Sequence, residues 1–124
     1  MRRVSRRSGP NASRRAVARK VIRAHQLLGQ ALGRDLISVP AWDMLLDLYL
    51  REHPKPMSLT GLCGATRAPA RTALRTIDRM VDRGLLLRSR DQADGRRVNV
   101  VMSPSAFRLL NQYFDDILAL FTPV

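Results

Sequence analysis

Apolar side chains repeat at spacings of three and four residues in two stretches of the N-terminal half, which is the period of one helix face. The first stretch predicts a helix over about residues 14–36, although Gly29 and Gly33 each lower its helix propensity by up to about 1 kcal/mol relative to Ala. The second stretch predicts a helix from near Pro40 that ends before Pro54, because proline cannot continue a helix. The residues expected to face inward are Val17, Val21, Ala24, Leu28, Ala31 and Leu32 in the first helix and Trp42, Leu45, Leu46, Tyr49 and Leu50 in the second.

Two further helices are predicted between Ser58 and Gly84. Ser58 can cap a short helix that begins directly after it. Pro69 suits the first turn of the next helix, and Arg83-Gly84 supplies a cationic last turn followed by a glycine that can end it. This helix of about fifteen residues is roughly 22 Å long, enough to lie in a major groove. Its expected inner face consists of Ala73, Leu74, Ile77, Met80 and Val81, and its expected outer face of Arg71, Thr72, Arg75, Asp78, Arg79 and Asp82.

After Gly84 the pattern changes from a helical period to a period of two, which predicts a pair of short antiparallel strands. Asp94-Gly95 supplies the turn between the strands, because this pair tolerates the positive φ that a hairpin requires. Leu85, Leu87 and Ser89 alternate with Leu86, Arg88 and Arg90, and Val98, Val100 and Met102 alternate with Arg97, Asn99 and Val101. A basic hairpin beside a helix with outward arginines has the plan of a winged helix-turn-helix, with arginine placed to enter a minor groove.

The last segment predicts a helix that begins at Ser103-Pro104, a cap followed by a first-turn proline. Its apolar residues step by three and four, which forms a heptad-like seam. We expect this helix both to fold back on the first helix and to meet the same helix of a second subunit. The residues expected to form the dimer are Val17, Val21, Leu28, Phe107, Leu110, Phe114, Ile117 and Phe121.

The stretch from about Ala41 to Phe121 resembles the MarR family of bacterial transcription regulators. The residues that carry the resemblance are Thr72-Ala73-Leu74-Arg75-Thr76-Ile77-Asp78-Arg79-Met80, Arg83-Gly84-Leu85-Leu86, Arg88, Asp94-Gly95-Arg96-Arg97 and Met102-Ser103-Pro104. The resemblance implies that Arg71, Thr72 and Arg75 contact bases or phosphates, and that Asp94 holds Arg96 or Arg97 for the minor groove. The expected DNA-binding residues are Arg67, Ala70, Arg71, Thr72, Arg75, Arg79, Arg90, Arg96 and Arg97, with Asp94 and Gly95 positioning the wing.

The predicted fold class is therefore mainly α with a small β-hairpin (α+β), a winged helix-turn-helix with flanking N- and C-terminal dimerisation helices. A basic disordered arm over residues 1–13 precedes a single domain over 14–124, with the DNA-binding core at 40–103 and the dimerisation helices at about 14–36 and 104–121. The chain departs from the family pattern at Gly61, where a capping box would have Glu or Gln, and at Arg67, where a glycine is common. It also ends one helix earlier than a typical family member.

The formal net charge of +12 favours polyanions through counterion release. All the basic residues except Lys20 and Lys55 are arginines, a preference that a GC-rich genome would also produce. No run approaches eighteen apolar residues, so no membrane span is expected. Cys63 is the single cysteine, which indicates a reducing compartment, and it is either a small packed residue or a redox-sensing thiol.

The first 23 residues hold nine basic residues and no acid appears before Asp35. The composition up to Ser13 is typical of a disordered arm, which could track the DNA backbone or enter a minor groove. It also resembles an organellar transit peptide, and a solvated tail that aids solubility is the third interpretation. The basic residues are Arg2, Arg3, Arg6, Arg7, Arg14, Arg15, Arg19, Lys20 and Arg23.

Nothing in the sequence favours catalysis. His25 and His53 have no metal-ligand spacing, and glycine-rich phosphate loops, nucleophile elbows and cysteine pairs are lacking. We expect no enzyme activity, no metal and no cofactor. The expected function is sequence-specific binding of double-stranded DNA by a homodimer, as a repressor of transcription in a bacterial cytoplasm. A small-molecule effector is implied by the family likeness alone, and the alternatives are a nucleic-acid binder without sequence preference and a winged-helix adaptor for other proteins.

Overall fold

The computed structural model describes residues 10–51 and 55–122. It is mostly helical, with one small antiparallel sheet, and it confirms the predicted fold class of a winged helix-turn-helix. The elements, in order, are α2 (Pro10–Leu32), the 3₁₀ helix η1 (Arg34–Leu36), α3 (Val39–Tyr49), β1 (Met57–Ser58), α4 (Leu59–Cys63), α5 (Ala70–Asp82), β2 (Leu86–Arg90), β3 (Val98–Met102) and α6 (Pro104–Phe121).

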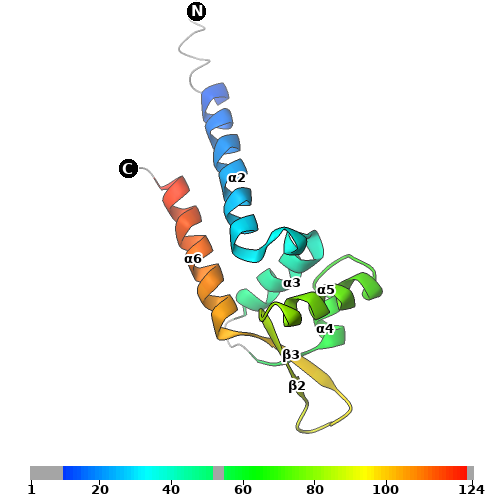
Figure 1. Ribbon diagram of the computed structural model, residues 1–124. Coiled ribbons are helices and arrows are strands. Elements are labelled where there is room, and N and C mark those ends of the chain that lie inside the picture. The colour runs from blue at the N-terminus through cyan, green and yellow to red at the C-terminus, as the bar shows by residue number, and fades with distance from the viewer. Residues whose placement is uncertain (1–9, 52–54, 123–124) are drawn as a thin grey trace, which may run out of the picture.

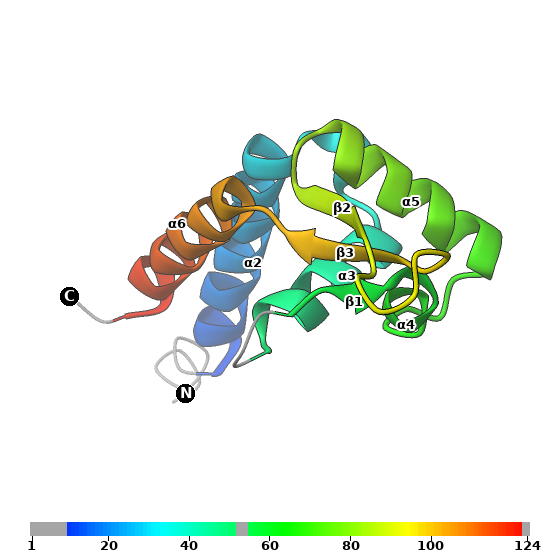
Figure 2. The same cartoon turned by 90° about the horizontal axis from the view of Figure 1, so that it is seen from below.

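The helices and the sheet separate into two ends of the molecule (Figure 1). Helices α2 and α6 run antiparallel beside each other and project away from the rest, with the N-terminal part of α2 extending beyond α6. The other end holds α3, α4, α5 and the sheet, with the β2–β3 hairpin pointing away from the chain termini. Figure 2 shows the same separation from below, with α2 and α6 on one side of α3 and with α4 and α5 on the other. None of the helices within the described ranges is both long and apolar enough to cross a membrane.

The sheet has three strands in the order β1-β3-β2, all antiparallel. The predicted hairpin is confirmed, with Leu86 opposite Met102 and Arg90 opposite Val98. Strand β1 was not predicted. It contributes two residues, with Met57 opposite Val100, and it covers the second edge of β3.

The core lies between the inner face of the sheet and the buried faces of α3, α5 and α6, with α2, η1 and α4 adding leucines at its edges. Its largest fully buried side chains are Leu36, Met44, Leu45, Leu62, Ile77, Met80, Leu86, Val100 and Leu110. Burial of Ile77 and Met80 holds α5 by one face and leaves its opposite face in solvent.

Four residues that were predicted to face inward are exposed. Leu50 is 75% exposed because, at 3.6 residues per turn, it lies on the side of the helix opposite the buried Ala41, Leu45 and Leu48. Leu74 is 41% exposed, and Thr76 takes the buried position because its hydroxyl donates to the Thr72 carbonyl at 2.9 Å. Val17 and Val21 are exposed in the N-terminal half of α2, the part of the helix that extends beyond α6.

The first helix also differs from its predicted bounds of about 14–36. It ends at Leu32 because Gly33 adopts a left-handed φ of 86°, and η1 then forms a separate turn. It begins at Pro10, so residues 10–13 of the expected disordered arm are helical, and proline is well suited to a first turn. Residues 1–9 of that arm lie outside the described residues.

The end of α5 confirms the predicted glycine cap. Gly84 has a φ of 77°, its N–H donates to the Val81 carbonyl at 2.9 Å, and the Leu85 N–H donates to the Met80 carbonyl at 2.8 Å. This pair of hydrogen bonds is the Schellman motif, and the burial of Leu85 and Met80 supplies its apolar contact. The motif turns the chain directly from α5 into the hairpin.

Candidate nucleic-acid interface

The solvent face of α5 presents a row of arginines. Arg71, Arg75 and Arg79 follow one another at four-residue spacing, and all three are exposed. None of them forms an ion pair with any residue that the structure describes. Thr72 is also exposed beside them. The guanidinium groups therefore remain available to an external acceptor such as a phosphate or a base edge.

The turn that precedes α5 is held by local hydrogen bonds. Ser58 caps α4, its Oγ accepting from the Gly61 N–H at 3.0 Å. A Cβ built on Gly61 would lie 3.0 Å from that Oγ and 3.3 Å from the Met57 methyl group, so a larger residue at this position would require those two side chains to shift slightly. Thr66 Oγ1 accepts from the Ala68 N–H at 3.3 Å. Arg67, at the expected glycine position, has a negative φ like every described non-glycine residue, and it is exposed together with Ala70.

Asp91 organises the loop at the tip of the hairpin, a role that was not predicted. Its Oδ1 accepts from the N–H groups of Ala93 at 2.7 Å and Asp94 at 3.1 Å, and its Oδ2 accepts from Asn99 Nδ2 at 3.2 Å. The Ala93 N–H, the Asn99 amide and the Asp94 N–H lower the pKa of Asp91 below its ordinary value of 3.8, with a smaller contribution from the Arg97 charge. An aspartate at a strand end that is followed by polar and small residues is a typical Asx-turn signal, which could have identified it.

Asp94 and Gly95, predicted to position the wing, lie at its tip. Asp94 Oδ1 accepts from the Arg96 backbone N–H at 3.1 Å and lies 3.6 Å from the Arg96 Nε. The Arg96 side chain is nevertheless 96% exposed. Arg90, predicted to bind DNA, uses its Nη1 to donate to the Gly95 carbonyl at 2.8 Å, so part of its guanidinium serves the wing itself. Arg97 is exposed, and its N–H donates to the Asp94 carbonyl at 2.9 Å.

Two ion pairs fix α5 relative to its neighbours. Asp78 pairs with Arg88 and so joins α5 to β2, and Arg83 pairs with Asp35 and so joins the end of α5 to η1. All four side chains are largely exposed, so each pair contributes little to the free energy of unfolding. Their geometric effect is to hold the arginine row of α5 and the wing in one orientation.

Ser103 connects the end of α5 to the start of α6. It is buried, its Oγ accepts from the Ala106 N–H at 3.1 Å as the cap of α6, and it donates to the Gly84 carbonyl at 2.7 Å. The Ser103 N–H also donates to the Leu85 carbonyl at 2.9 Å. The arginine-bearing helix and the long C-terminal helix therefore share one buried junction.

The comparisons with known proteins agree with this geometry. No protein-family model and no curated protein sequence matches the chain. Among solved structures, a probable transcriptional regulator from Pseudomonas aeruginosa is 25% identical, with a TM-score of 0.53 over 86% of this chain and 82% of its own. A variant of MepR from S. aureus, solved bound to an oligodeoxyribonucleotide, is 20% identical with a TM-score of 0.70 over 88% and 78%. BpsR from Bordetella bronchiseptica, whose DNA binding is regulated by 6-hydroxynicotinic acid, is 22% identical with a TM-score of 0.53 over 87% and 78%.

The chain has a MarR-like winged-helix fold. In this MarR-like frame, α4, α5 and the turn between them form the helix-turn-helix, and β2–β3 forms the wing. The resemblance inferred from the residues between Thr72 and Pro104 is thus confirmed.

The residues expected to form the dimer fall into two groups in the MarR-like fold. Leu28 and Leu110 are buried in the core of the chain itself, and Phe107 and Phe114 pack against Tyr49 with ring centroids 6.2 and 5.1 Å apart. Val17, Val21 and Phe121 are exposed on α2 and α6, with Lys20 Nζ 5.6 Å from the centroid of the Phe121 ring. Ile117, which is partly buried against the core, belongs with the buried group. The exposed group, Val17, Val21 and Phe121, leaves an apolar surface at the distal end of α2 and α6.

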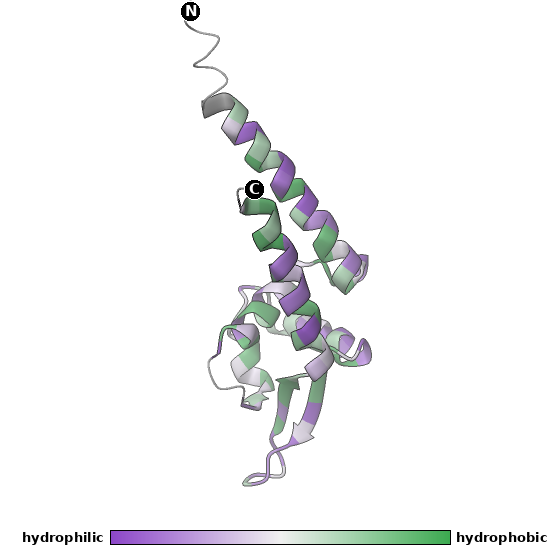
Figure 3. Cartoon of the chain, turned by 90° about the vertical axis from the view of Figure 1, so that its left-hand side faces the viewer, coloured by the Kyte–Doolittle hydropathy of each residue, from purple (hydrophilic) through white to green (hydrophobic). Residues whose placement is uncertain are grey.

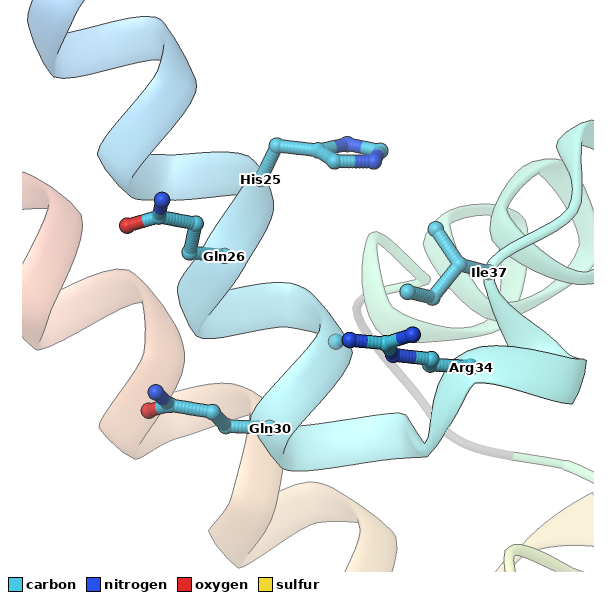
Figure 4. A pocket seen from close by; sticks show the side chains of 6 residues that line it. His25, Gln26, Gln30, Arg34 and Ile37 are labelled. Carbon is cyan, nitrogen blue, oxygen red and sulfur yellow. The ribbon is translucent and has the colours of Figure 1, made fainter.

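An open, cavity-like groove of about 290 Å³ lies between α2, α3 and α6. It is lined mainly by apolar side chains, among them Leu28, Trp42 and Tyr113. His25 stands between this groove and an open hollow of about 670 Å³, which Figure 4 shows with Gln26, Gln30, Arg34 and Ile37. A small-molecule effector for this MarR-like chain stays a prediction.

Two further expectations concern chemistry rather than DNA. Within the described ranges no group of three or more His, Cys, Asp or Glu side chains is placed to hold a metal ion. His25 is exposed on α2, and His53 lies outside the described residues. Cys63 is a partly buried thiol that packs against the core, as expected for a small packed residue.

Proposed function

We propose that this chain is a regulator of transcription that binds double-stranded DNA sequence-specifically as a homodimer and represses by occupying a palindromic operator in a bacterial cytoplasm. The observation that carries the proposal is the exposed arginine row of α5, which has no ion-pair partner among the described residues and is flanked by a wing with a fully exposed arginine. The P. aeruginosa neighbour is described as a probable transcriptional regulator, and the MepR variant was solved with DNA.

In the proposed complex α5 lies in the major groove. Arg71, Thr72 and Arg75 are near its N-terminal end, where they would reach base edges or phosphates. Arg67 precedes the helix and would contact the backbone, while Arg96 or Arg97 would enter the neighbouring minor groove. Repression then needs no further surface, because a bound dimer excludes polymerase from the promoter.

The apolar distal surface supports the homodimer. Val17 and Val21 on α2 and Leu118 and Phe121 on α6 are all exposed large apolar side chains. Burying them against a second copy would remove apolar area from water, which favours association. Two copies related by a two-fold axis would present their α5 helices to half-sites about 34 Å apart.

The experiment that tests the proposal is selection of bound fragments from sheared genomic DNA at about 0.2 M salt, where non-specific binding through several phosphates is strongly weakened. We expect one palindromic motif, and its loss with R71A/R75A. Equal recovery of all fragments would instead favour a binder without sequence preference, to which the net charge of +12 also points. Recovery of nothing would favour the protein-interaction adaptor.

A further inference from the structure

Helix α2 carries a second basic surface that the proposed operator complex does not use. Arg15, Arg19 and Arg23 recur every four residues and are exposed, and Gln26 and Gln30 continue the same line. We call these five residues the α2 stripe. It lies on the face opposite Leu28 and Leu32, which are buried against the rest of the chain. Figure 3 shows hydrophilic segments recurring along this helix.

The charge of the α2 stripe is not neutralised within the described residues. Arg15, Arg19 and Arg23 form no ion pair there, and the sequence has no acid before Asp35. The neighbouring α6 carries Asp115 and Asp116, and Asp116 already accepts from Gln112 at 3.0 Å. Like charges four residues apart destabilise a helix, so an external polyanion would relieve repulsion along α2.

The position of the stripe separates it from the proposed operator. The N-terminal half of α2 projects beyond α6, at the end of the molecule opposite the hairpin (Figure 1). The helix has 23 residues and is therefore about 34 Å long. A straight duplex in contact with α5 and the wing cannot also follow the distal half of α2. The expected DNA-tracking arm, where it is helical, therefore points away from the DNA that α5 would bind.

We infer that the α2 stripe binds the phosphate backbone of a second DNA duplex, so that one regulator bridges two DNA segments. Successive stripe arginines are about 6 Å apart along the helix axis, close to the rise of two nucleotides along one strand. Val17 and Val21 would be covered in the proposed dimer, which leaves Ile22 as the exposed large apolar side chain of α2, too little for the broad apolar face that a membrane-surface helix needs. This inference rests on the proposed DNA-binding function and adds a second contact to it.

A bridging assay tests the inference. A biotinylated duplex of about 40 base pairs is attached to beads and saturated with the full chain; this length allows non-specific contacts with several phosphates. Capture of a second, fluorescent duplex is then measured as a function of salt concentration. We expect the wild-type protein to capture it, and R15Q/R19Q/R23Q to reduce that capture at least tenfold while retaining binding to the first duplex. The salt slope of the second binding event should become shallower by up to about 3, one for each arginine–phosphate contact that the variant removes.

The matched control removes the same charge elsewhere. Arg51, Lys55 and Arg108 are exposed and lie outside both the α2 stripe and the α5 and wing surfaces, so R51Q/K55Q/R108Q should bridge like the wild type. Glutamine has a helix propensity close to that of arginine, and circular dichroism would verify that both variants are folded. Unchanged capture by the stripe variant, equal reduction in both variants, or recruitment of anionic lipid vesicles in place of the second duplex would each overturn the inference.

Failure of bridging is distinguishable from failure of the proposed operator binding. The variant R71A/R75A should lose the palindromic motif in the fragment selection and still capture DNA at low salt through the α2 stripe. If the stripe variant keeps the motif but does not bridge, both proposals stand. If the wild type selects the motif but captures no second duplex, operator binding stands and the α2 inference is wrong.

Discussion

At the scale of single residues, Asp91 has the largest structural role among the polar side chains of the wing. Its carboxylate closes the tip by accepting from two backbone N–H groups and from Asn99 on the opposite strand. Without these bonds the loop between β2 and β3 would be ordered mainly by Asp94 and Arg90. Preorganisation lowers the entropy that binding must remove, so Asp91 would favour DNA binding without touching DNA.

We therefore expect Asp91→Ala to weaken DNA binding about fivefold, because the tip of the wing loses the three hydrogen bonds that order it. The variant Asp91→Asn combined with Asn99→Asp keeps one carboxylate and one amide in contact and should restore most of the affinity. Fluorescence anisotropy with a labelled duplex at fixed salt measures both. If D91A binds as tightly as the wild type, the wing does not depend on this network.

The pKa of Asp91 gives a second test of the same contacts. Because folding lowers this pKa below 3.8, the stability that the carboxylate gives the wing is fully present above pH 3.8 and is lost as the pH falls through the lower folded value. A carbon-detected NMR titration of the Asp91 carboxyl group should therefore show a midpoint below that of an unstructured aspartate. A midpoint at or above 3.8 would contradict the hydrogen bonds described.

Residue roles were predictable where a local rule decides them. Gly84 ends α5 as expected, because a glycine after a cationic last turn is a strong local signal. Leu50 was expected to be buried and is not, because apolar residues lie on more than one side of α3 and the pattern alone does not show which side packs against the core. Thr76 is buried although it is polar, because the Thr72 carbonyl satisfies its hydroxyl within the same helix.

At the scale of elements, α5 and the wing should contribute differently to DNA binding. Alanine at Arg71 or Arg75 should relax base preference by about 1–3 kcal/mol at one position. Alanine at Arg96 or Arg97 should weaken binding to all sequences more evenly and reduce the salt slope by about one for each phosphate that is no longer bound. Affinities for a selected motif and a scrambled duplex, each measured over a range of salt, separate the two effects. If neither pair alters binding, the proposed docking of α5 is wrong.

The junction between α5 and α6 makes a prediction about stability. Ser103→Ala removes the α6 cap and leaves the Gly84 carbonyl without its buried hydroxyl donor, so the free energy of unfolding should fall by about 1–2 kcal/mol. Ser89 is an exposed serine on β2, away from this junction, and Ser89→Ala should change the free energy of unfolding by less than about 0.5 kcal/mol. Urea unfolding followed by circular dichroism measures both. If both substitutions lowered the free energy of unfolding equally, the hydrogen bonds of Ser103 would not be what stabilises the junction between α5 and α6.

The elements that the sequence did not predict depend on contacts between distant residues. Strand β1 is two residues long, and its pairing is determined by β3, which lies far away along the chain, so it has no local pattern of its own. The hairpin was predicted because its period of two and its Asp94-Gly95 turn are both local. The ion pairs that join α5 to β2 and to η1 likewise require the tertiary fold before their partners can be recognised.

At the scale of the whole molecule, the chain separates a compact winged-helix end from a two-helix end with exposed apolar and basic faces (Figures 1 and 3). The Schellman motif and Ser103 connect α5 to α6 through buried contacts. A change in how α2 and α6 meet a second copy would therefore reach the recognition helices through a short rigid path. The spacing between two half-sites would depend on that contact.

The proposed dimer is tested by placing a charge in its apolar surface. Leu118 is 64% exposed on α6, so Leu118→Glu should leave the fold intact but would bury an unpaired carboxylate between two copies. Light scattering should report a mass near twice 14.0 kDa for the wild type and near 14.0 kDa for this variant at micromolar concentration. Leu50→Glu, at a similarly exposed leucine directly after α3 and away from the distal ends of α2 and α6, is the control and should remain dimeric.

The same variant tests the link between dimerisation and operator binding. In a dimer the two α5 helices bind two half-sites together, which raises the affinity for the whole operator. The L118E variant should therefore bind the operator about a hundredfold more weakly while keeping weak binding to single half-sites. A monomeric wild type, or a dimer that survives L118E, would show that the exposed ends of α2 and α6 do not hold two copies together.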